Sequence, residues 1–75
     1  SGYSSYVNLQ DLNGARASSA DGEMRSRGFT GRGGYKDGEH SMTTWWNVST
    51  RQCVSMAVQD GRVAHLSAIP ESNCR

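Results

Sequence analysis

The dipeptide Asp60-Gly61 places the strongest constraint on how this chain can fold. Asp-Gly is typical of a type I′ turn, because both central residues of that turn take a positive φ and its twist matches that of two paired strands. The flanking runs, 52–59 and 62–69, are rich in valine and alternate with polar residues as strands do. The sequence therefore predicts a β-hairpin that turns at residues 60 and 61.

The turn also predicts the register of this hairpin. If Gln59 pairs with Arg62, a regular ladder assigns every later side chain to one of two faces. The first face then carries Val54, Met56, Val58, Val63, His65 and Ile69, and the second carries Cys53, Ser55, Ala57, Ala64, Leu66 and Ala68. Neither set is plainly polar, so each face needs a cover.

A single short helix is predicted before the strands. Ser18 or Ser19 can cap its first amide groups, acidic residues follow in its first turn, and arginines lie in its last turn. Gly28 ends it. The helix needs a sheet to lie on because its apolar stripe is thin, consisting only of Ala17, Ala20 and Met24.

The remaining segments complete an α+β domain. Residues 41–47 are dense in Thr and Trp and predict another strand, whereas 29–32 predict a weaker one that is followed by a polar loop over 33–40. Residues 1–8 predict a flexible N-terminal tail. The predicted fold is one domain over residues 9–75, with one short helix packed on a three- or four-stranded antiparallel meander and anchored by leucines at positions 9 and 12.

A shortage of large apolar side chains makes the two cysteines important. Only ten residues are Leu, Ile, Val or Phe, yet the net charge is +1, which is not typical of a disordered chain. A disulfide between Cys53 and Cys74 would close a loop of about 20 residues and contribute roughly 3 kcal/mol. Two free thiols or a metal pair are the alternatives, although His40 and His65 lie at no recognisable ligand spacing.

Charge balance and motifs argue against several classes of function. Eight Lys and Arg stand against seven Asp and Glu, so we expect no nucleic-acid partner, and no apolar run is long enough for a membrane span. The stretch 31–34 is a single arginine-glycine box, and few basic residues surround it, so it is a weak signal for RNA binding. It also lacks the Lys-Ser/Thr pair that ends a phosphate-binding loop. No serine lies in a nucleophile elbow. We therefore predict a noncatalytic protein without a cofactor or a metal ion.

The adjacent tryptophans carry much of the apolar area, because each can bury about 150–250 Å². Neighbours in a strand point to opposite faces, so one is predicted to be core and the other to lie on the second face or at the rim. An exposed Trp would suit stacking on a sugar or a peptide. The candidate binding residues are Trp45, Trp46, Met56, His65 and Arg62.

The triplet Asn47-Val48-Ser49 matches the acceptor pattern for N-glycosylation at the end of a predicted strand. In a bacterial protein the pattern has no such meaning. Asn47 is then a turn residue that closes the connection through Ser49 and Thr50.

Several motifs together resemble those of a group of small exported bacterial domains. In these periplasmic or lipoprotein-borne domains a short helix precedes a strand ending in Trp-Trp-Asn, a Thr-x-x-Cys turn, an Asp-Gly-Arg hairpin and a terminal Cys. The matching residues here are Trp45-Trp46-Asn47, Thr50, Gln52-Cys53, Asp60-Gly61-Arg62 and Cys74, preceded by Asp11-Leu12, Gly14 and Arg27-Gly28-Phe29. The resemblance spans residues 9–74. It implies export and the pairing of Cys53 with Cys74, and it implies no particular activity.

These features favour a noncatalytic module that binds a protein of the bacterial cell envelope, as an inhibitor, an immunity-type or an accessory protein. A disulfide indicates an oxidising compartment, either the periplasm or the outside of the cell. The expected partner is another envelope protein or a second copy of the chain, bound at an incompletely covered sheet face. The alternative is a module that binds glycan or cell wall through an exposed Trp.

Overall fold

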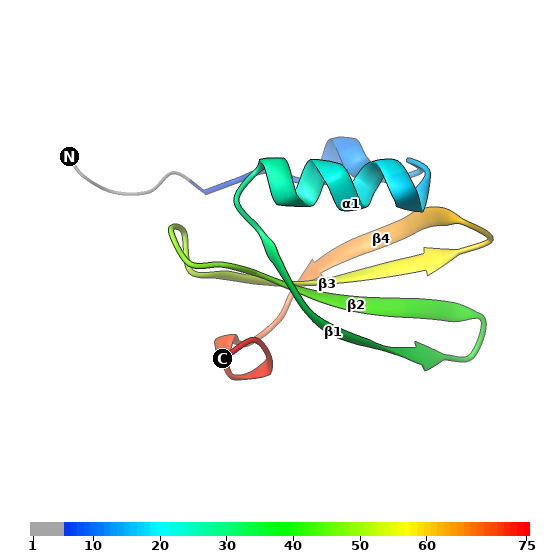
Figure 1. The fold of residues 1–75 in the computed structure, drawn as a ribbon. Coiled ribbons are helices and arrows are strands. Elements are labelled where there is room, and N and C mark those ends of the chain that lie inside the picture. The colour runs from blue at the N-terminus through cyan, green and yellow to red at the C-terminus, as the bar shows by residue number, and fades with distance from the viewer. Residues whose placement is uncertain (1–5) are drawn as a thin grey trace.

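The computed structural model describes residues 6–75, which form one helical layer on one sheet (Figure 1). A 3₁₀ turn (Gln10–Leu12) precedes helix α1 (Ala17–Ser26), and a second 3₁₀ turn (Glu71–Asn73) ends the chain. Between them lie strands β1 (Thr30–Asp37), β2 (His40–Asn47), β3 (Gln52–Gln59) and β4 (Arg62–Ala68). The strands are antiparallel neighbours in the order β1-β2-β3-β4. The predicted α+β meander is confirmed, with four strands.

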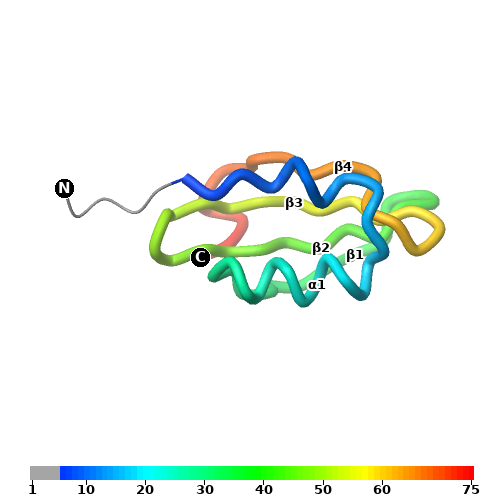
Figure 2. The backbone as a smooth tube through the Cα atoms, turned by 90° about the horizontal axis from the view of Figure 1, so that it is seen from above, coloured from blue at the N-terminus to red at the C-terminus, as the bar shows by residue number. Residues whose placement is uncertain are grey.

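The N-terminal segment and α1 together cover one side of the sheet. Seen from above, α1 lies over β1 and β2, and the segment before it lies over β3 and β4 (Figure 2). Leu9 and Leu12 are buried, as predicted for anchors. Of the predicted tail, residues 1–5 lie outside the described residues. Val7 is fixed to the sheet, because its N–H donates to Oε1 of Gln52 and its carbonyl accepts from Nε2 of the same side chain.

Helix α1 begins without the predicted serine cap. Its N-cap residue is Arg16, and no side chain caps the first turn. The N–H of Ala17, the first helical residue, donates to the carbonyl of Gly61 at 2.8 Å, so the turn between β3 and β4 satisfies one amide group at the start of the helix. The predicted end at Gly28 is confirmed, and its φ of 96° is one that glycine adopts readily.

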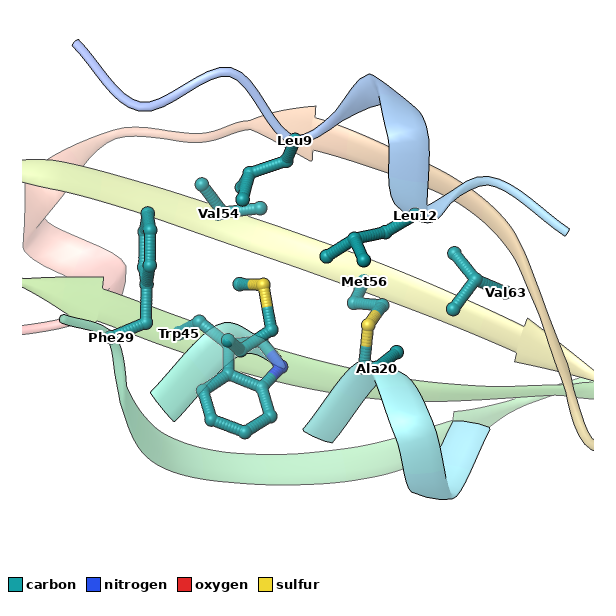
Figure 3. Packing of buried hydrophobic residues seen from close by; sticks show 9 residues of the cluster. Leu9, Leu12, Ala20, Phe29, Trp45, Val54, Met56 and Val63 are labelled. Atoms are coloured by element: carbon teal, nitrogen blue, oxygen red, sulfur yellow. The ribbon is translucent and has the colours of Figure 1, made fainter. Parts of the chain in front are cut away.

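The core lies between α1, the N-terminal segment and the facing side of the sheet. Ala20 and Met24 of the predicted helix stripe are fully buried there. Figure 3 shows the indole of Trp45 lying flat under α1 while the leucines reach down from the N-terminal segment. The cluster consists of Leu9, Leu12, Ala20, Met24, Phe29, Trp45, Val54, Met56 and Val63.

Strand β1 runs through the glycine-rich stretch that the sequence assigned to a loop. A register shift between Gly31 and Gly34 shows that the glycines form a bulge inside the strand. A Cβ atom at Gly34 would lie 2.5 Å from the carbonyl oxygen of Met42, so only glycine allows β1 and β2 to approach this closely. The predicted loop over 33–40 is therefore wrong: the strand continues to Asp37.

A second bulge changes the predicted register of the β3–β4 hairpin. The two pairs next to the turn are as predicted, namely Gln59 with Arg62 and Val58 with Val63. Beyond them Ala57 pairs with His65 rather than with Ala64, which leaves Ala64 as an extra residue.

The bulge moves the following side chains to the face opposite the predicted one, because faces alternate along a strand. Leu66 packs against the core cluster on the side covered by α1 and the N-terminal segment. His65, expected among the apolar side chains of Met56 and Val63, pairs with Ala57 on the other side of the sheet. The predicted faces are therefore wrong for His65, Leu66, Ala68 and Ile69, the last of which packs against Cys53 and Trp46 rather than beside Val54 and Met56, and correct for β3.

The predicted disulfide between Cys53 and Cys74 is confirmed, with the Cα atoms 5.9 Å apart. The chain reaches it because the N–H of Ile69 still donates to the carbonyl of Cys53, after which Pro70 and the second 3₁₀ turn bring Cys74 back. Trp46, the disulfide and Ile69 pack together as a second apolar cluster. We call these four residues the disulfide cluster.

Candidate protein-binding face

The side of the sheet that faces away from α1 is largely bare of other elements (Figure 1). Directly paired residues share a face, so the strand registers define its members. One row runs across all four strands as Tyr35, Met42, Ala57 and His65, and a neighbouring row contains Thr44, Ser55 and Ser67. We call these seven residues together with His40 the open face.

One end of this side is covered by the C-terminal turn. The disulfide cluster lies there, and Trp46 is only 8% exposed. The guanidinium of Arg51 lies 5.7 Å from the ring centre of Trp46 and pairs with Glu71 at 2.7 Å. That ion pair, chiefly its hydrogen bond, lowers the pKa of the Glu71 carboxyl. These contacts cover the end of this side that lies at the disulfide cluster, and the other end stays uncovered by the C-terminal turn.

The open face combines an exposed aromatic ring with small and half-buried side chains. Tyr35 is 61% exposed, and Met42 is half-buried beside it. Ala57 is fully buried, so the larger side chains around it cover its methyl group. Tyr and Met are enriched and Lys and Glu depleted at protein interfaces. Tyr35 and Met42 therefore suit contact with another protein, whereas the small side chains of Ser55, Ser67 and Ala57 are of types that interfaces use less often.

Two of the five candidate binding residues belong to the core. Trp45 and Met56 are each 1% exposed and lie below α1. The guanidinium of Arg25 lies 5.5 Å from the ring centre of Trp45. Trp46 belongs to the disulfide cluster. Neither tryptophan is therefore available as an exposed platform, which corrects the expectation on which the glycan-binding alternative depends.

The other two candidates remain at the surface. Arg62 is exposed, but its Nη1 donates to the carbonyl of Gly14 at 3.0 Å and so holds the loop before α1. His65 is exposed and lies on the open face. It is the only one of the five candidates among the eight residues of the open face, although the register places Arg62, which pairs with Gln59, on the same side of the sheet near the turn.

Sequence reasoning missed Tyr35, Met42 and His40 as members of the same face. Tyr35 fell in the predicted loop, so no register could be assigned to it. Met42 pairs with both Tyr35 and Ala57. The sequence predicted that Met42 lies in a strand but not which residues it pairs with. The Asp37-Gly38 signal would not have given this pairing, because the central turn residues are Gly38 and Glu39, one position later, and a count from Asp37-Gly38 pairs Tyr35 with His40 instead.

An ion cluster on the other side of the molecule joins α1 to the N-terminal segment. Arg27 donates to both carboxylate oxygens of Asp11, with the shorter distance at 2.6 Å, and also to Glu23 at 3.0 Å. The hydrogen bond from Arg27 lowers the pKa of Asp11, and the same bond raises the pKa of Arg27. All the charges are paired, so the arrangement fits a structural link rather than a catalytic group.

Other candidate sites in the described residues are small or lacking. A hollow of about 130 Å³ lies between the N-terminal segment and β4, well below the roughly 300–1,000 Å³ of ligand pockets. Among residues 6–75 no group of three or more potential metal ligands is gathered together. No helix in this range has the length and apolar character to cross a membrane.

Comparison with known proteins gives no relative: no family model, no curated protein and no solved structure matches this chain. The functional argument therefore depends on the open face itself.

Proposed function

We propose that this protein is an exported, noncatalytic module that binds another protein of the bacterial cell envelope through its open face. The observation that carries the proposal is the unequal cover of the sheet. Helix α1 and the N-terminal segment protect one side, whereas the C-terminal turn protects only one end of the other (Figure 1). A sheet side of this kind gains stability when a partner covers it.

Export is supported by the disulfide and by the resemblance to exported bacterial domains. Disulfides persist in the periplasm and outside the cell and are rare in a reducing cytosol. Cys53 and Cys74 are both buried. An oxidising compartment is the one in which this covalent link would form and last, so we place the protein in the periplasm or among secreted proteins.

An inhibitor, an immunity-type protein or an accessory subunit would each use such a face. All three roles need a preformed surface more than a deep pocket, because protein interfaces depend on a few aromatic and methionine contacts within a flat, complementary area. Tyr35, which is exposed and held in a strand, is the side chain best placed to enter a partner's pocket.

The test is capture of the partner from an envelope extract, followed by measurement of its affinity for two matched variants. Tyr35→Ala removes the ring from the open face. Lys36→Ala changes the next residue of β1, which points to the opposite side and donates to Ser41. We expect Tyr35→Ala to weaken binding at least tenfold and Lys36→Ala to leave it within about twofold, the contrast typical of a hot spot and a neutral position.

Equal affinities of the two variants would show that the open face is not the binding surface. A sedimentation measurement on the pure protein distinguishes a second copy of the chain from a different partner. Addition of cell-wall fragments at millimolar concentration is expected to leave tryptophan fluorescence and amide shifts unchanged, since both tryptophans are buried.

A further inference from the structure

We propose that His40 and His65 together bind a divalent transition-metal ion, such as Zn²⁺, at the rim of the open face. The two imidazoles come from β2 and β4 and are separated in sequence by two strands and two turns. Their ring centres lie 6.2 Å apart, with the planes tilted by 60°. This proposal does not depend on what protein the open face binds.

The distance between the rings suits a shared ion. A Zn²⁺ ion lies about 2.0–2.1 Å from each ligating nitrogen, so two imidazoles bound to one ion have ring centres roughly 5–6 Å apart. The observed 6.2 Å is slightly longer than this range. A small side-chain rotation therefore brings one nitrogen of each ring to a common ion without movement of the strands.

The strand between the two histidines leaves space for this approach. Ala57 of β3 is the direct partner of His65 and is fully buried. Its methyl group is too small to separate the rings, so they can lean toward one another across β3.

Both imidazoles are accessible and free to act as ligands. His65 is exposed and His40 half-buried. Within residues 6–75 neither ring takes part in a hydrogen bond, so no nitrogen is held by a protein partner there. The carboxylate-bearing Asp37 pairs with His40 across the β1–β2 turn and adds negative charge on the same side of the sheet.

The donor set selects the class of ion. Imidazole nitrogen suits Zn²⁺, Cu²⁺ and Ni²⁺, whereas Mg²⁺ and Ca²⁺ require oxygen ligands. No third ligating side chain joins the pair among the described residues, so water occupies the remaining positions. The bulge at Ala64 is what creates the pair, because a regular register would have turned His65 toward the core.

The proposal can be tested by calorimetric titration of the untagged protein with ZnCl₂ in a buffer that does not chelate the ion. We expect one ion per chain and no heat of binding with MgCl₂. His40→Gln and His65→Gln should each lower the Zn²⁺ affinity about tenfold or more, since even loss of an outer-shell contact costs about 10–100-fold. Ser67→Ala, on the same face of β4, should leave the affinity within about twofold.

Thermal unfolding of each variant without metal verifies that the fold is retained, which the exposed position of His65 favours. A loss of less than about tenfold in either histidine variant would mean that this imidazole is not a ligand, and the proposal would be overturned. The same conclusion would follow if Ser67→Ala weakened binding as much as the histidine variants. Since the titration contains no protein partner, its outcome leaves the proposed function untouched.

Discussion

At the scale of single residues, Asn47 shows how one polar side chain can organise a junction. It is 2% exposed at the end of β2. Its Oδ1 accepts from the N–H groups of Ser49 and Thr50, and its Nδ2 donates to the carbonyl of Arg27. The turn interpretation of this residue is confirmed, whereas a buried and fully bonded amide is a poor acceptor for a glycan.

Replacement of Asn47 by Ala is expected to lower the free energy of unfolding by at least about 2 kcal/mol, because it leaves two backbone N–H groups and one carbonyl without their partner. Urea denaturation followed by circular dichroism measures the change. Asn73→Ala is the matched control, since that exposed side chain bonds only to the carbonyl of Pro70. Similar stabilities of the two variants would contradict the structural role of Asn47.

The Arg27–Asp11 ion pair makes stability depend on pH in a defined direction. The pKa of Asp11 is lower in the folded protein than in the unfolded chain, so the pair stabilises the fold above the unfolded pKa and this contribution is lost as pH falls through the folded value. Asp11→Asn should therefore have a lower melting temperature than the wild type near pH 7. The difference should shrink below about pH 4, where the carboxylate gains a proton.

Melting curves between pH 7 and pH 3 test this expectation. The effect is small and weakens with added salt, because the Asp11 side chain is 61% exposed. A difference between wild type and Asp11→Asn that stays constant over the whole pH range would show that the carboxylate charge plays no part.

At the scale of elements, local signals predicted the strands better than their exact pairing. The Asp60-Gly61 turn predicted β3, β4 and the two pairs next to the turn. The bulge at Ala64 is marked only by a change of phase, because Val63 is apolar at an odd position and Leu66 at an even one, and a regular ladder ignores this change. In β1 the glycines argued against a strand by propensity, yet Gly34 is required by the close approach of β2. Tertiary contacts, which sequence patterns do not report, decided both cases.

The bulge predicts the order of stability of two neighbouring variants. Leu66→Ala should lower the free energy of unfolding by about 1–2 kcal/mol, since the half-buried Leu66 side chain packs against the core. His65→Ala should change it by no more than about 0.5 kcal/mol, because that side chain is exposed on the open face. Urea denaturation of both variants gives the comparison, and the reverse order would indicate the regular register.

At the scale of the whole molecule, the sequence predicted a fold with too little cover for its sheet but not which side chains would be uncovered. The shortage of apolar residues and the single short helix were evident from composition and pattern. The open face depends on two bulges, and the burial of both tryptophans depends on the C-terminal turn. Of the eight residues of the open face, the sequence identified only His65 as a candidate. The register used for that prediction placed it on the wrong side of the sheet.

The disulfide is the feature of the whole molecule on which stability should depend most. In the chain-entropy view a bridge between Cys53 and Cys74 contributes roughly 3 kcal/mol, similar to the ~3–5 kcal/mol that a core of this size supplies. Reduction should therefore lower the urea midpoint strongly and expose Trp46, which packs beside the bridge. Circular dichroism and tryptophan fluorescence with and without reductant measure both effects. The double variant Cys53→Ser with Cys74→Ser should behave like the reduced protein, whereas an unchanged midpoint in either form would mean that the core alone maintains the fold.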